Sequence, residues 1–117
     1  MCMRRCALAV VATLLAAASA YAVDYSFDIY DHEGNGGWNG QVVVWQRLET
    51  AATWESLTTI QWNPPQLPFT GASNYYYAFR AIIDDNPPYS PFVYPDPVSG
   101  TVELHCTLTT PPDNPCD

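Results

Sequence analysis

Residues 23–29, Val-Asp-Tyr-Ser-Phe-Asp-Ile, alternate strictly between apolar and polar side chains. Successive side chains of an extended chain point to opposite faces, so this segment has one apolar face and one polar face. The pattern predicts a half-buried β-strand. The same alternation returns late in the chain, where a second strand is expected to direct these side chains inward: Val98, Val102, Leu104, Cys106 and Leu108.

Several short segments between these two also favour strands. Residues 42–45 read Val-Val-Val-Trp, and branching at Cβ favours an extended chain. Residues 58–62 form another strand candidate, and residues 75–83 are apolar enough on both faces to predict a central strand. Residues 48–57 suit either a short helix or an edge strand. Short strands separated by Gly- and Pro-rich turns predict an all-β fold, a small antiparallel β-sandwich or barrel.

Residues 1–22 have the pattern of a secretory signal peptide. Arg4 and Arg5 precede an apolar segment at residues 7–15, and Ala20-Tyr21-Ala22 matches a small-x-small cleavage site. The apolar segment is shorter than the roughly 20 residues that span a bilayer. The sequence therefore predicts a secreted or periplasmic protein that has no membrane anchor after cleavage.

Charge narrows the classes of partner. All twelve acidic residues follow Ala22, whereas only Arg47 and Arg80 remain of the four basic residues, so the 95-residue mature chain has a net charge of −10. Such a surface repels phosphate backbones and anionic lipid, which excludes nucleic acid and membrane surfaces as expected partners. Proteins, sugars and cations remain.

Two cysteines would leave with the signal peptide, and two would stay. Cys106 and Cys116 are expected to form a disulfide in an oxidising compartment, tying the Pro-rich tail at residues 109–117 back to the last strand. A redox or metal-binding pair is the alternative, but the spacing is not that of a CxxC motif.

Part of the chain resembles a fibronectin type III or immunoglobulin-like module. Tyr77-Ala78-Phe79-Arg80 is similar to the opening of that family's F strand, and Ser90-Pro91 falls where its following loop has Ser-Pro. Leu67-Pro68-Phe69-Thr70 looks like the approach to that strand. The resemblance covers roughly residues 42–108 and implies a sandwich fold for the predicted domain at residues 23–108, although residues 23–40 are short for the two opening strands of that family. Residues 27–45 also resemble the opening of a transthyretin-like sandwich, so the topology stays open.

The loop after the first strand resembles the start of a calcium loop. Asp31, Glu33 and Asn35 place oxygen atoms at alternate positions, and Gly36 follows where a sharp turn is needed. The twelfth position, Val42, lacks the closing carboxylate, which Asp84 or Asp85 could supply only if their loop lies at the same end. A plain Gly/Asn turn has the same composition and is the alternative.

Aromatic residues are abundant and suggest a second kind of site. Trp45, Trp62 and Tyr77 are expected in the core. Exposed rings can stack on sugar rings, and the candidates lie among Gly, Thr, Ser and Pro residues: Trp38, Trp54, Tyr89 and Tyr94.

No motif for a nucleophile, a zinc site or an acid–base pair is visible, so catalysis is not expected. We expect a non-catalytic module that binds another protein through its strand edges and the Pro/Tyr-rich loop at residues 86–97. A carbohydrate-binding module is the alternative, and a small secreted enzyme or inhibitor is a third possibility.

Overall fold

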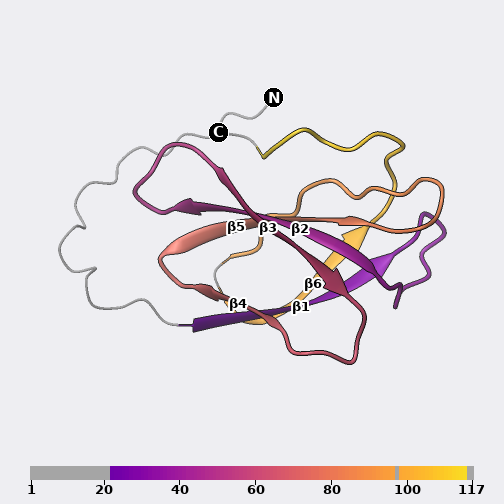
Figure 1. The fold of residues 1–117 in the computed structure, drawn as a ribbon, viewed down its shortest axis with the longest axis horizontal. Coiled ribbons are helices and arrows are strands. Elements are labelled where there is room, and N and C mark those ends of the chain that lie inside the picture. The colour runs from indigo at the N-terminus through magenta and orange to yellow at the C-terminus, as the bar shows by residue number, and fades with distance from the viewer. Residues whose placement is uncertain (1–21, 97, 116–117) are drawn as a thin grey trace.

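The computed structural model describes residues 22–96 and 98–115, and these form strands and loops without a helix (Figure 1). The strands are β1 (Ala22–Tyr30), β2 (Gly40–Leu48), β3 (Glu55–Trp62), β4 (Phe69–Ala72), β5 (Tyr75–Ile82) and β6 (Gly100–His105). Among these residues there is accordingly no helix with the length and apolar character needed to cross a membrane. The predicted all-β class is confirmed.

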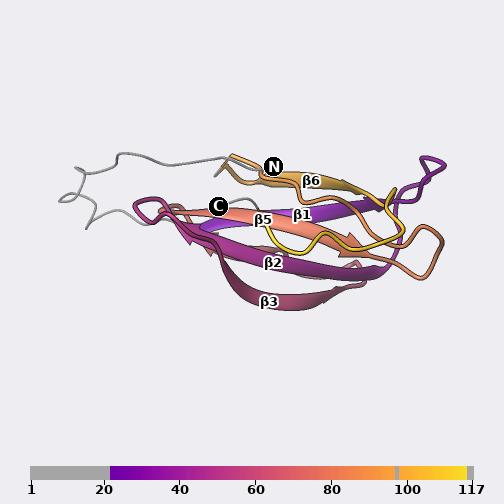
Figure 2. The ribbon, with the colours of Figure 1, turned by 90° about the horizontal axis from the view of Figure 1, so that it is seen from above.

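The strands form two three-stranded sheets that lie in separate layers (Figure 2). One sheet has the order β4-β1-β6 and the other the order β3-β2-β5. Every pairing is antiparallel except that of β1 with β6, which is parallel along its whole length, from Tyr25 beside Gly100 to Tyr30 beside His105. The antiparallel prediction is therefore wrong for this pair. Two facing sheets are compatible with the expected β-sandwich.

The core lies between the sheets and is rich in aromatic rings. Phe27 packs edge-on against Trp62 and Phe79, with ring centroids 5.0 and 4.8 Å apart. The Trp62 indole Nε1–H also donates to the Phe27 carbonyl oxygen at 2.9 Å, which satisfies its only polar group inside the core. The inward face predicted for residues 23–29 is confirmed, since Val23, Tyr25, Phe27 and Ile29 are all at most 5% exposed.

Some predicted positions differ in the structure. Val98 lies before β6 and is 68% exposed, so its inward assignment is wrong. Trp45 lies beside a β-bulge, where Leu57 is the extra residue of β3, and it is only half-buried. Trp62 and Tyr77 belong to the core as expected. Residues 48–57, which were compatible with helix or strand, contain the end of β2, a turn and the start of β3.

The central strand of the second sheet is β2, and β5 is an outer strand of that sheet. The prediction that residues 75–83 form a central strand is therefore wrong. Residues 88–93 cover the free edge of β5, so this outer strand has backbone partners on both sides. Phe79 exchanges two backbone hydrogen bonds with Val93, and the Ile83 N–H donates to the Pro88 carbonyl. Between these two positions, Ser90 forms hydrogen bonds with Ala81.

Ser90 is fully buried and pairs with Ala81 through both its backbone and its side chain. The Ser90 N–H donates to the Ala81 carbonyl at 3.0 Å, and the Ser90 Oγ accepts from the Ala81 N–H at 2.7 Å. The hydroxyl thus takes the place of a backbone carbonyl at the edge of β5. The backbone of the Pro/Tyr-rich loop is therefore used largely within the molecule.

The predicted signal peptide, apart from its last residue, and Cys116 lie outside the described residues, so the leader and the disulfide stay predictions. Cys106 is fully buried at the end of β6. Burial, with the carboxylates of Asp85 and Asp31 nearby, raises the pKa of the Cys106 thiol to about 11. A thiol in this environment is a poor nucleophile at neutral pH.

Candidate functional site

The edge of β3 is the longest open strand edge that the described residues contain. β3 has eight residues and is last in its sheet, and all but Ile60 and Trp62 of its side chains are exposed. No charged residue or proline lies between Ser56 and Trp62. The other outer strands differ, since β6 has six residues and carries Glu103, and β4 has only four.

One end of this edge is already capped by Gln66. Its Nε2 donates to the Gln61 carbonyl at 3.0 Å, and its Oε1 accepts from the Asn63 N–H. The Gln61 carbonyl therefore faces away from β2. Because backbone groups alternate along an antiparallel strand, Thr59 directs its N–H and C=O to the same open edge. Unpaired groups of this kind are a template for another strand.

Aromatic side chains form a continuous strip beside the start of β3. Trp54 lies edge-on to Tyr94 with centroids 5.7 Å apart, and Phe92 lies 6.5 Å from Tyr94 and 6.4 Å from Trp45. We define the aromatic strip as these four rings, the two arginines that lie over two of them, and the two further tyrosines that the arginines contact. Its residues are Trp45, Arg47, Trp54, Tyr76, Arg80, Tyr89, Phe92 and Tyr94.

Both arginines of the strip lie over aromatic rings, as expected for side chains that cover apolar surface. The Arg47 guanidinium is 4.7 Å from the Tyr76 ring centre and 5.4 Å from that of Trp54. Arg80 lies 5.9 Å from Tyr89 and 5.8 Å from Phe92, and burial lowers the pKa of its guanidinium. Such contacts fix the rings in place and leave the strip without an exposed, mobile cation.

The structure brings together three of the four rings that the sequence suggested for ligand binding. Trp54 and Tyr94 touch, and both are partly open to solvent, with Tyr94 44% exposed. Tyr89 belongs to the same strip through Arg80. Trp38 does not belong to it, since it lies in the loop between β1 and β2 and packs against the core.

Asp31 organises that loop. Its Oδ1 accepts from the backbone N–H groups of Asn35 at 3.0 Å and Glu33 at 2.9 Å, and its Oδ2 accepts from the Asn35 side chain and from the Trp38 indole at 3.3 and 3.1 Å. These donors, led by the Asn35 backbone, lower the pKa of Asp31. The carboxylate therefore holds the turn and the indole in place.

The same contacts bear on the calcium interpretation of Asp31, Glu33 and Asn35. Both carboxylate oxygens of Asp31 are engaged by the protein itself, and Glu33 is exposed and 3.9 Å from His32. Within residues 22–96 and 98–115, no three His, Cys, Asp or Glu side chains are grouped so as to hold a metal ion. Calcium binding stays a prediction.

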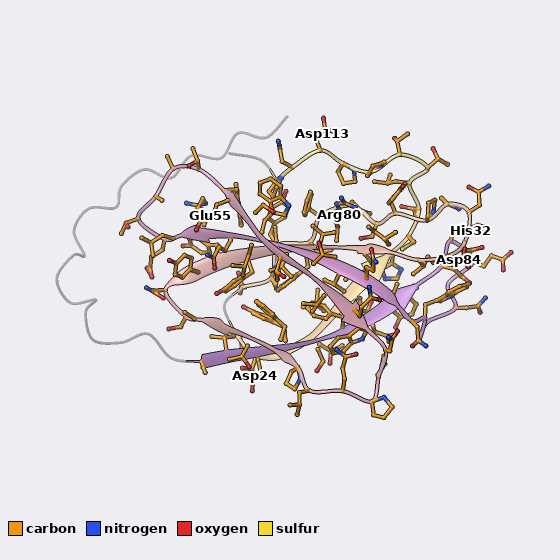
Figure 3. All side chains as sticks on the ribbon, viewed as in Figure 1. Asp24, His32, Glu55, Arg80, Asp84 and Asp113 are labelled. Carbon is orange, nitrogen blue, oxygen red and sulfur yellow. The ribbon has the colours of Figure 1, made fainter. Side chains whose placement is uncertain are left out.

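A shallow, open hollow of about 470 Å³ lies beside Trp38. Its lining comes from two loops that are distant in sequence: Gly36, Gly37, Trp38, Asn39 and Asp84. The loop after β1 and the loop after β5 lie at the same end of the molecule (Figure 1), and Figure 3 shows His32 and Asp84 close together there, far from Glu55. The clustering that the sequence left conditional is thus present.

Sequence reasoning missed the role of Ser90, because it depends on contacts between separate segments. The spacing from Asp31 to Asn35 was visible, but it also fits the turn that the carboxylate closes. No protein-family model matches the chain, and neither a curated protein nor a solved structure matches it.

Proposed function

We propose that this chain is an exported, non-catalytic interaction module that binds an extended segment of another protein by strand addition along β3. The observation that carries the proposal is the contrast between the two edges of one sheet. Residues 88–93 satisfy the outer backbone groups of β5 at Phe79 and Ala81, and that of Ile83 directly after it. No described strand does the same for β3.

Strand addition uses main-chain hydrogen bonds for affinity and neighbouring side-chain contacts for specificity. Thr59 offers the main-chain groups, and Leu57, 42% exposed, lies on the same strand. Trp54 and Tyr94 of the aromatic strip lie where the strand begins, and such residues, with arginine, dominate the energy of many interfaces. This surface therefore offers both the main-chain hydrogen bonds and the side-chain contacts that strand addition uses.

The charge of the chain indicates the chemistry of the partner. With twelve acidic residues after Ala22 and both later arginines lying over rings, the surface repels acidic chains. We propose a basic segment with alternating apolar side chains as the partner. A second copy of this chain is disfavoured by the same repulsion.

The immunoglobulin-like family assignment is part of the same proposal. Pairing of β2 with β5 supports it. Residues 42–47 of β2 look like the C strand of that fold, residues 77–80 of β5 resemble its F strand, and the C and F strands are neighbours in that fold as well. The parallel pairing of β1 with β6 is a departure from it.

A selection of random peptides displayed on phage, with the mature chain immobilised, tests the binding proposal. Enriched peptides should be basic, should bind the wild type, and should lose at least tenfold in affinity with Thr59→Pro. That substitution removes an outward N–H but no hydrogen bond to β2.

Thr59→Val is the matched control, since it keeps the backbone donor and a β-branched side chain, and it should bind like the wild type. The thermal unfolding midpoint, Tm, of both variants establishes that they fold. If no peptide is enriched, or if the enriched peptides bind Thr59→Pro as tightly as Thr59→Val, the proposal is overturned.

A further inference from the structure

We infer that the hollow beside Trp38 is a binding subsite for a neutral pyranose ring of an oligosaccharide. It lies at the end of the molecule opposite Glu55, where β3 begins, so it is a different site from the aromatic strip (Figure 3). Three features support the inference: a rigidly held indole, a wall without side chains, and two unengaged polar groups.

The indole of Trp38 is fixed before any ligand arrives. Its Nε1–H donates to Asp31 Oδ2 at 3.1 Å, and its backbone N–H donates to the Ile29 carbonyl at 3.1 Å. One side packs against the core, and the ring as a whole is only partly buried. A ring held in this way loses little conformational freedom when a sugar stacks on it.

The wall of the hollow depends on two glycines. Gly37 has a φ of +77°, which favours glycine, and its N–H donates to Asp28 Oδ1 at 2.9 Å. A Cβ at Gly36 would lie 2.9 Å from the Tyr30 ring and 3.0 Å from Asp28 Oδ1. The loop therefore passes close to β1 and places no side chain of its own between Trp38 and solvent at these two positions.

Polar groups stand at the rim. Asn39 and Asp84 are exposed and line the hollow from different loops. Their side chains make no hydrogen bond with another described residue. An amide and a carboxylate can together accept and donate hydrogen bonds to neighbouring hydroxyl groups.

The charge and depth of the hollow select among saccharides. Asp84 is followed by Asp85, and Asp28 near the end of β1 and Asp31 in the adjoining loop add two more carboxylates. This negative charge disfavours uronic acids and other anionic sugars. Because the hollow is shallow and open, it suits one ring of a longer chain and does not enclose a small ligand.

The test uses ¹⁵N-labelled mature protein and a panel of soluble hexasaccharides: cello-, xylo-, manno-, laminari- and chitohexaose, with hexagalacturonic acid as the anionic comparison. The Trp38 indole N–H cross-peak, assigned by its loss in Trp38→Phe, reports on the hollow. At least one neutral hexasaccharide should shift this peak saturably, and the anionic one should not.

Variants locate the site. Asn39→Ala and Asp84→Ala should each weaken binding about tenfold, which is the effect of removing one hydrogen bond to a ligand. Trp54→Phe, in the aromatic strip, should leave the affinity unchanged. A panel without any saturable shift of the Trp38 peak overturns the inference, and so does a sugar whose binding is lost in Trp54→Phe but kept in Asp84→Ala. Neither result affects the binding of peptides at β3.

Discussion

Ser90→Ala tests whether a side-chain hydroxyl completes the edge of β5. In the wild type the Ser90 Oγ accepts from the Ala81 N–H at 2.7 Å, and Ser90 and Ala81 are fully buried. Alanine leaves the Ala81 N–H without a partner and without access to water. An unsatisfied buried donor costs about 1–3 kcal/mol, which for a domain of this size lowers Tm by about 4–24 °C.

Thermal unfolding followed by circular dichroism gives the Tm. Amide hydrogen exchange adds a local measurement, since the Ala81 N–H should exchange faster in the variant. Ser56→Ala is the matched control, because Ser56 is exposed on β3 and should be replaceable at little cost. A Tm within about 1 °C of the wild type, with the Ala81 N–H still protected, would refute the reasoning.

Three further substitutions test other contacts. Asp31→Asn removes a carboxylate whose pKa is lowered in the fold, so its contribution to stability is present above the unfolded pKa of about 3.9 and is lost as pH falls through the folded pKa. The variant should have the lower Tm at pH 7, and the difference should shrink at pH 3; an equal difference at both values contradicts this. Gly40→Ala should fail to fold or lose much of its Tm, because a Cβ there would lie 2.4 Å from the Ile82 carbonyl oxygen; a Tm like that of the wild type would show that the strands separate easily. Cys116→Ser should lower the free energy of unfolding by about 2–3 kcal/mol without abolishing folding, and an unchanged Tm would mean that the disulfide with Cys106 does not form or does not matter.

Local patterns predicted strands well because each strand has its own periodicity. The alternation of residues 23–29 identified β1 and its buried face, and the Val-Val-Val segment identified β2. Pairing between strands is a property of distant segments, and the sequence contains no local signal for the parallel neighbour of β1. The same is true of β5: its two apolar faces predicted a central strand, and no local pattern indicates that residues 88–93 would pair with its outer edge.

The candidate sites were predictable as residue types but not as groups. Trp54 and Tyr94 are 40 residues apart, and only the fold places their rings in contact. Trp38 was grouped with them because all three lie in polar, turn-rich segments, yet it belongs to the opposite end of the molecule, beside Asp84. At Asp31 the residue pattern was visible but ambiguous. The spacing of oxygen-bearing residues that is typical of a calcium loop is also found where a carboxylate accepts hydrogen bonds from its own turn.

The parallel pairing of β1 with β6 has a consequence for synthesis. The Asp24 N–H donates to Ser99 Oγ across 75 residues of sequence, and β1 lies between β4 and β6. A nascent chain that has emerged only as far as β5 can pair β2 with β3 and β5 and β1 with β4, but the core still lacks Val102, Leu104 and Cys106. Contacts of such long range also slow folding. The native core should therefore be complete only after the last strand is made, which for the exported protein that we propose delays stable folding until nearly all of the chain has been synthesised.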